Sequence, residues 1–381
     1  MKERKKILFC TPFDLSTGGG IPRCSHHIIN YYNEQKNSEY ELKLLPMDRT
    51  VYGNKGKRKN VLRFIRRMIH GLSDYTKILD NIKLELDKDS YDIVHIASSA
   101  SISLYKDYLC LKELRKRKIN SIIHFHFGRI PELEKINNWE WKSILKIAQL
   151  ASKIIVIDTA SYNTLKKHGV TNVEYLPNPL SPNIEKIIEQ YHNIDRNDNT
   201  VLFVGHVIRT KGVYELAEAC SSIENINLKI VGLYSDVVKN ELIDIYKKNK
   251  NISKIEFTGK IPAEDVIKEM LSCTVFALPT YTEGFPNVIL ESMACSCPIV
   301  TTNVGAIPEM LDIKNGDNYG ICIYPQDIDN LKYAISRMLD NPSFAQKCGE
   351  NAKNRVKDMY SINKVWEQMC KIWDTTAIKN Y

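Results

Sequence analysis

The sequence lacks several common signatures, and each absence excludes a class of protein or of binding site. No apolar run approaches the ~20 residues that a membrane-spanning helix needs, and no apolar core of a signal peptide follows the basic start MKERKK. The 10 cysteines form no C-x-x-C pair, and no second Cys or His pair at zinc spacing accompanies Cys295 and Cys297. We therefore expect a soluble or peripheral protein of a reducing cytoplasm, with free thiols.

Other patterns are missing as well. The glycine-rich stretch from Ser16 to Gly20 does not form the G-x-G-x-x-G fingerprint of a dinucleotide-binding site. No internal repeat or low-complexity tract occurs along the chain. The 381 residues, of which 43 % are hydrophobic, are enough for two globular domains of ordinary size.

Apolar segments that fit β-strands alternate with amphipathic helical segments along the whole chain. This order predicts an α/β protein with parallel sheets that are covered on both faces by helices. Strands are expected at 5–13, 40–47, 91–98, 119–127, 153–158 and 172–178, and then at 200–206, 227–232, 254–259, 274–279, 298–303 and 320–325. A polar stretch at 181–199 separates these two groups, and helices are expected at 327–340, 343–358 and 361–376. We therefore expect one domain over residues 1–180, a second over 181–360, and a C-terminal helix over 361–381.

The net charge of +8 is unevenly distributed. Apolar residues recur at helical spacing up to Leu72 in a stretch that also carries Lys55, Lys57, Arg58, Lys59, Arg63, Arg66 and Arg67. A basic amphipathic helix of this kind either lies on an anionic membrane or packs on its own domain with a solvated basic face. Nucleic acid is not indicated, because no nucleic-acid-binding motif or stacking-aromatic pattern accompanies the charge.

The most informative segment is TEGFPNVILESMACSCPIVTTNVGAIPEMLD, residues 282–312. Glu283 lies in a short polar turn, and Pro286 suits the first turn of the helix that follows. Glu291 lies five residues past the proline, roughly 8 Å further along the helix axis. Backbone N–H groups at this helix start favour an anion, and they belong to Gly284, Phe285, Asn287 and Val288. Two carboxylates on either side of an anion pocket suit a nucleotide-sugar, which has hydroxyls at both ends and phosphate between them.

This segment resembles the E-x7-E signature of retaining glycosyltransferases of the large family 4. The resemblance covers nearly the whole chain and is strongest from Val201 to Leu311. It implies a GT-B architecture, in which two Rossmann-like domains face a central cleft and a C-terminal helix crosses back to the first domain. The first domain would then bind the acceptor and the second the nucleotide-sugar donor. Glu283 would contact the transferred sugar and Glu291 the ribose hydroxyls, while Ser296 replaces the glycine that the family usually has at its position.

The segment FVGHVIRTKGVYELAEA places cations directly after a predicted strand. Arg209 and Lys211 lie in its loop, where two cations would neutralise a departing diphosphate without a metal ion. The resembled family usually has an Arg directly after the strand's glycine and a Lys six residues beyond that glycine. Lys211 matches the second position, but His206 occupies the first. The partner of Lys211 is therefore Arg209, a protonated His206 or both, unless these charges are simply solvated.

Two further positions are candidates in the first half of the chain. His124 and His126 alternate along a predicted strand, so both side chains face the same way near its C-terminal end, the edge at which open parallel sheets bind ligands. The resembled family has a His there that contacts the donor sugar, for which His126 fits better than His124; a structural His is the alternative. The loop of Gly18, Gly19 and Gly20 allows a close approach of backbone to a ligand, and the resemblance places it near the donor diphosphate and the acceptor.

We therefore expect a retaining glycosyltransferase that moves a hexose or N-acetylhexosamine from a nucleotide-sugar, with UDP favoured as the nucleotide. The resemblance implies a glycan or polyprenyl-diphosphate-linked acceptor and a role in bacterial surface polysaccharide, such as capsule or lipopolysaccharide. The expected location is the cytoplasm, with peripheral contact to the inner face of the cell membrane. We expect no cofactor, because the donor is itself a substrate, and no metal, because the loop cations would neutralise the diphosphate. The alternatives are a nucleotide-sugar epimerase of the same fold and a non-catalytic nucleotide-sugar-binding protein.

Overall fold

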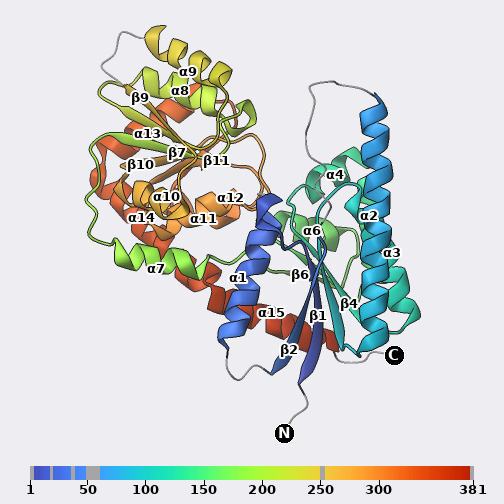
Figure 1. The fold of residues 1–381 in the computed structure, drawn as a ribbon. Coiled ribbons are helices and arrows are strands. Elements are labelled where there is room, and N and C mark those ends of the chain that lie inside the picture. The colour runs from blue at the N-terminus through green and yellow to red at the C-terminus, as the bar shows by residue number, and fades with distance from the viewer. Residues whose placement is uncertain (1–3, 18–19, 36–38, 49–60, 249–253, 378–381) are drawn as a thin grey trace. The chain divides into compact units, whose positions relative to one another are not determined.

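The structure is a computed structural model that describes residues 4–17, 20–35, 39–48, 61–248 and 254–377. The chain forms two compact units (Figure 1). One consists of Met1–Pro177 together with Trp366–Tyr381, and the other of Asn178–Val365. Each unit has its own parallel sheet of 6 strands, so the predicted α/β class is confirmed.

The first sheet has the strand order β2-β1-β3-β4-β5-β6. Its strands are β1 (Lys5–Thr11), β2 (Tyr40–Pro46), β3 (Ile93–Ser98), β4 (Asn120–Phe125), β5 (Lys153–Val156) and β6 (Val173–Tyr175). The helices around it are α1 (Gly20–Glu34), α2 (Val61–Lys88), α3 (Ser103–Lys116), α4 (Ile130–Ile136), α5 (Trp139–Leu150) and α6 (Thr159–Lys167), and the short 3-10 helix η1 is Leu15–Thr17. The central strands are nearly continuous apolar runs because helices cover the sheet on both faces.

The two faces of the first sheet have different partners. Val94 and Ile123 belong to a large apolar core on the face that packs against α2, α3 and α5. His95 and His124, the next residues along those strands, point to the opposite face. That face packs against α1 and against α15 (Ile362–Ala377), which brings Trp373 next to His95 (Figure 1).

The basic stretch of the sequence coincides with the start of α2. Arg63, Arg66 and Arg67 lie in this helix, which begins at Val61 and is longer than expected because it continues to Lys88. The preceding basic residues, Lys55, Lys57, Arg58 and Lys59, lie outside the described residues. Within the described part of the chain, no helix has the length and apolar character needed to cross a membrane. The membrane-binding role of this stretch stays a prediction.

The second sheet has the order β12-β11-β10-β7-β8-β9. Its strands are β7 (Thr200–Val204), β8 (Asn227–Val231), β9 (Lys254–Gly259), β10 (Val275–Leu278), β11 (Ile299–Thr302) and β12 (Ile321–Ile323). Its helices are α7 (Pro182–Gln190), α8 (Val213–Ser221), α9 (Asp236–Lys248), α10 (Ala263–Ser272), α11 (Asn287–Ala294), α12 (Ile307–Met310), α13 (Ile328–Asp340) and α14 (Pro342–Arg355). The 3-10 helices are η2 (Arg209–Lys211) and η3 (Ile313–Asn315), and a π-helical turn, η4 (Val356–Tyr360), follows α14. Figure 1 shows α8 and α9 on one face of this sheet, with α10, α11 and α14 on the other.

The twelve predicted strands are all present. Most are shorter than predicted at the carboxyl end, because Pro or Gly residues turn the chain there. The helix after Glu283 begins one residue later than expected, since Pro286 is its N-cap and Asn287 its first residue. All 10 cysteines are free thiols, as expected.

Candidate active site

The carboxyl edge of the second sheet brings the two strongest sequence motifs together. Lys211 lies in η2 after β7, and Glu283 lies in the turn after β10. The Lys211 Nζ and a Glu283 carboxylate oxygen are 2.5 Å apart, and their side chains are 25 % and 13 % exposed. This ion pair joins residues that are 72 positions apart in the sequence. It places a cation beside the carboxylate that the first half of the E-x7-E pattern supplies.

Backbone contacts fix the loop that carries Lys211. Gly212 has a φ of +72°, and a Cβ added there would lie 1.9 Å from the carbonyl oxygen of Pro279. Only glycine fits so close to another backbone. The Tyr281 amide donates to the Thr210 carbonyl at 2.9 Å, and the buried Thr280 hydroxyl donates to the same carbonyl at 3.3 Å. The loops after β7 and β10 therefore form one rigid structure.

A second glycine supports the turn that carries Glu283. Gly305 has a φ of +57°, and a Cβ there would lie 2.3 Å from the Glu283 carbonyl oxygen and 2.7 Å from that of Gly284. The amide of the next residue, Ala306, donates to the Gly284 carbonyl at 2.9 Å. The segment between β11 and α12 thus holds the Glu283 turn by direct backbone contact.

The start of α11 has the features of an anion site. Among the residues that the structure describes, the amides of Gly284, Phe285, Asn287 and Val288 have no hydrogen-bond acceptor, as expected for the first turn of a helix. The buried Oδ1 atom of Asn287 also has no hydrogen-bond partner there. Phe285 is buried and packs edge-on against Tyr360, with 5.8 Å between ring centroids. Glu291 is half-buried one turn further along α11.

The other two predicted cations do not approach Glu283 as Lys211 does. Arg209 is exposed, and its guanidinium carbon lies 3.9 Å from the centre of the Tyr214 ring. The Tyr214 hydroxyl in turn donates to the Glu241 carboxylate. His206 is exposed at the carboxyl end of β7. Outside the masked segments, no group of three or more His, Cys, Asp or Glu side chains is arranged to hold a metal ion.

In the first unit, His126 lies one residue beyond the end of β4 and is half-buried. Its amide donates to the Ser98 carbonyl at 3.0 Å. The rings of His124 and His126 are stacked, with 3.9 Å between centroids and 29° between planes. Burial lowers the pKa of His124 well below its usual value, with smaller contributions from His126 and His95. Gly20 is the first residue of α1, and Gly18 and Gly19 lie outside the described residues.

The sequence reading missed several residues that hold this site. Gly305 was part of a recognised motif, and its place between a strand and a helix was the available signal for a close backbone approach. Thr280 gave no such signal, because a buried threonine at a strand end is ordinary. In the first unit, the contact of Trp373 with His95 also could not be predicted, since nothing in a sequence shows which strand a distant helix contacts.

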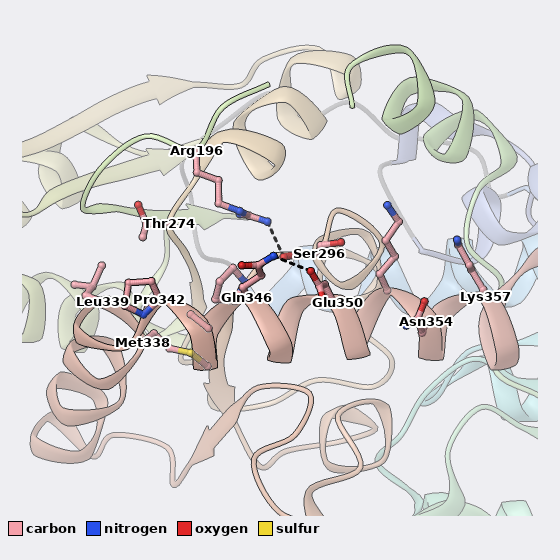
Figure 2. A pocket seen from close by; sticks show the side chains of 13 residues that line it. Arg196, Thr274, Ser296, Met338, Leu339, Pro342, Gln346, Glu350, Asn354 and Lys357 are labelled. Carbon is pink, nitrogen blue, oxygen red and sulfur yellow. Dashed lines mark hydrogen bonds between the residues drawn. The ribbon is translucent and has the colours of Figure 1, made fainter. Parts of the chain in front are cut away.

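A cavity of about 670 Å³ lies at the opposite edge of the second sheet. Thr274 and Pro298 line it just before β10 and β11, and α14 forms one wall (Figure 2). Arg196 points into this region, but its guanidinium already donates to the carbonyls of Cys273 and Ser296, at 2.6 and 2.7 Å. None of the predicted site residues lines this cavity.

Comparison with known proteins identifies the class of enzyme. The family described as Glycosyl transferases group 1 matches residues 184–355, which include the Lys211 loop, Glu283 and Glu291. The chain is a glycosyltransferase, and the similarity to group 1 lies in residues 184–355. This glycosyltransferase is 27 % identical over 274 residues to the capsular polysaccharide biosynthesis glycosyltransferase CapM of Staphylococcus aureus, a match that covers 69 % of each chain.

Two other similar proteins extend the comparison. One is the N-acetylgalactosamine-N,N'-diacetylbacillosaminyl-diphospho-undecaprenol 4-alpha-N-acetylgalactosaminyltransferase of Campylobacter jejuni, 27 % identical over 165 residues, or 43 % of this glycosyltransferase and 44 % of that protein. The other is the solved structure of Anabaena Alr3699/HepE in complex with UDP. It has a TM-score of 0.69 and 15 % identity, and it covers 97 % of this chain and 100 % of that one. At that identity the likeness establishes the fold, a GT-B architecture with two Rossmann-like domains.

Proposed function

We propose that this glycosyltransferase is a retaining enzyme of family 4 that transfers a hexose or N-acetylhexosamine from a UDP-linked donor. The proposed acceptor is a glycan or a polyprenyl-diphosphate-linked glycan of bacterial surface polysaccharide, used at the cytoplasmic face of the membrane. The observation that carries the proposal is the 2.5 Å contact between Lys211 and Glu283 at the carboxyl edge of the second sheet. The names of the Staphylococcus and Campylobacter relatives support the acceptor class, and the UDP bound by the Anabaena protein supports the nucleotide.

The proposed mechanism follows from where charge develops. As the bond between the sugar C1 and the phosphate oxygen breaks, its electron pair stays on the β-phosphate and positive charge grows on the sugar ring. Lys211 and the free amides at the start of α11 would stabilise the departing diphosphate. Glu283 would orient the sugar hydroxyls, and Glu291 would hold the ribose.

The remaining roles are also proposals. The acceptor hydroxyl would form the new bond to C1 from the face that the diphosphate leaves, and its proton would leave on the phosphate oxygen, so no separate base is required. Arg209 or His206 would add positive charge after a rearrangement of its side chain, and no metal would be needed. His126 is proposed as a contact of the transferred sugar.

The Lys211–Glu283 pair also suggests how the donor is received. In the structure the two charges satisfy each other. A diphosphate carries more negative charge than one carboxylate, so it competes for the Lys211 ammonium and frees Glu283 to accept from sugar hydroxyls. Lys211→Met should therefore weaken donor binding and lower kcat, whereas Glu283→Gln should mainly lower kcat, by roughly two to four decades.

The decisive experiment incubates the full-length protein with a panel of nucleotide-sugars and acceptors. Free nucleotide, epimerised sugar and acceptor product are then separated, and the anomeric configuration of the product is read by NMR. Lys247→Met, which removes an exposed lysine of α9, is the matched control for Lys211→Met. Epimerised sugar without acceptor product would favour an epimerase, and donor binding without turnover would favour a binding protein. Inversion at C1 would refute the retaining mechanism. Loss of turnover on adding EDTA would refute the proposal that no metal is needed.

A further inference from the structure

A line of buried ring nitrogens runs from α15 to the proposed sugar contact of the first unit. The Trp373 indole N–H donates to Nδ1 of His95 at 3.0 Å. The Nε2 of His95 lies 3.4 Å from Nδ1 of His124, and the His124 ring stacks on that of His126. Trp373 and His95 are 0 % exposed and His124 is 2 % exposed. These residues come from α15, β3 and β4, which are far apart in the sequence.

The direction of these hydrogen bonds follows from the chemistry of the rings. An indole N–H only donates, whereas each nitrogen of a neutral imidazole either donates or accepts. Because the Trp373 indole donates to it, Nδ1 of His95 must be unprotonated. Neutral His95 must then carry its proton on Nε2. That N–H donates to Nδ1 of His124, so neutral His124 must carry its proton on Nε2 as well. One indole thus sets the proton position in two imidazoles.

Burial keeps this pair neutral. It lowers the pKa of His95 to about 3, with a smaller contribution from His126, and it lowers the pKa of His124 well below the usual value. Trp373 is itself held in place, because the neighbouring Asp374 accepts from Lys5 and from the Tyr40 hydroxyl, each at 2.6 Å. The hydrogen-bond direction is therefore the same in every folded molecule at neutral pH.

The series of hydrogen bonds ends at His124, in an atom that has no partner among the described residues. The Nε2 of His124 is buried and has no hydrogen-bond partner there. A buried donor without an acceptor is unfavourable, so an oxygen atom, of water or of a sugar hydroxyl, is expected beside it. His126 stacks directly on this ring, and its own orientation therefore depends on how the His124 ring is held.

We propose that Trp373 is a positioning residue for His126. Its indole N–H fixes His95 and His124 as neutral Nε2–H tautomers, and this rigid pair fixes the orientation in which the His126 ring meets an oxygen of the donor sugar. The inference rests on the proposed function for the role of His126. The hydrogen-bond direction from Trp373 to His124 stands on the geometry of the first unit alone.

The first test needs no turnover. Protein labelled with 15N-histidine is examined at pH 7.5 by long-range proton–nitrogen correlation, and His95→Asn assigns the His95 signals. Wild type should show His95 and His124 with the proton on Nε2. Trp373→Phe keeps an aromatic ring but removes the donor, and at least one of the two imidazoles should then populate the Nδ1–H form. Trp366→Phe, which removes the neighbouring indole of α15, is the matched control and should keep the wild-type pattern. An Nδ1–H form of either residue in wild type would overturn the proposed direction.

The second test separates positioning from general damage to the fold. Trp373→Phe should lower kcat/KM for the donor by about two- to tenfold, the range expected from the loss of one neutral hydrogen bond, and Trp366→Phe should not. In a His126→Ala background, Trp373→Phe should cause no further loss. An equal loss with and without His126 would overturn the positioning role, and so would wild-type donor kinetics in His126→Ala. Failure of the proposed function would appear differently, as absence of transfer by wild type while the NMR result is unaffected.

Discussion

Gly305 offers a way to move the Glu283 turn without changing its chemistry. A methyl group at this position would lie 2.3 Å from the Glu283 carbonyl oxygen. Backbone atoms cannot give way as a flexible side chain does, so the turn must withdraw by about 1 Å to reach an ordinary contact distance. A misplacement of about 1 Å at a reacting group costs on the order of 10²-fold in rate. We therefore expect Gly305→Ala to lower kcat about 100-fold while Glu283 stays intact.

The same substitution has a separate cost in stability. Alanine in the left-handed region costs roughly 1–2 kcal/mol. Loss of the hydrogen bond from Ala306 to the Gly284 carbonyl would add about 0.5–1.5 kcal/mol. The free energy of unfolding should therefore fall by roughly 2–3 kcal/mol, which urea denaturation of the full-length protein measures.

Gly169→Ala is the control for the backbone cost alone. Gly169 has a φ of +78°, yet an added Cβ would meet nothing within 4 Å. This variant should lose roughly 1–2 kcal/mol of stability and keep its turnover. The reasoning is refuted if Gly305→Ala loses no more stability than Gly169→Ala, because the close approach would then be unimportant. Near-normal turnover by a destabilised Gly305→Ala would show instead that the position of the Glu283 turn does not limit the reaction.

Three further predictions concern other parts of the chain. Glu291→Gln should raise the donor Kd with little change in kcat, because ribose contacts are present in the ground and transition states alike. Titration calorimetry with the donor measures the Kd. An unchanged Kd would show that Glu291 does not bind the ribose. Burial lowers the pKa of His95 to about 3, so the folded protein keeps this ring neutral while the unfolded chain protonates it below about pH 6.5. Stability should therefore fall as the pH falls from about 6.5 towards 3, by up to about 1.4 kcal/mol per pH unit for this residue. Urea unfolding of His95→Asn should show a shallower dependence on pH, and an unchanged slope would contradict the assignment. Replacing Arg63, Arg66 and Arg67 with Glu should abolish salt-sensitive co-sedimentation with anionic vesicles, since each basic residue near such a surface contributes about 1 kcal/mol of binding free energy. Equal binding by wild type and the triple variant would identify the stretch as an ordinary solvated helix.

The order of strands and helices could be predicted because the signals are local. Segments such as KKILFC and SIIHFHF are apolar, β-branched or aromatic, and bounded by turn residues. The parallel pairing of the strands follows once strands and crossover helices alternate, whereas the order β12-β11-β10-β7-β8-β9 of the second sheet comes from the structure alone. Small errors occurred at the ends, as at Pro286, where the choice between N-cap and first helical residue depends on the local φ and ψ angles.

The site could be predicted only in part, because motifs give residue types and not their mutual contacts. The sequence placed Lys211 and Glu283 in one site through the resemblance, but their direct ion pair depends on the contact between two loops. The sequence predicts Arg209 near the diphosphate, whereas in the structure it stacks on Tyr214. That partner lies five residues away in the next helix, a spacing that carries no signal of its own.

The contact between α15 and the first sheet has a consequence for protein synthesis. Trp373 is made 248 residues after Phe125, the last residue of β4. At about 5–20 residues per second, this delay is on the order of 10 to 50 seconds. During that time the sheet face that carries Phe9 and His95 lacks α15, one of the two helices that cover it. The first unit therefore completes its fold only after the second unit has been made, and in the interval part of this apolar face is exposed to water.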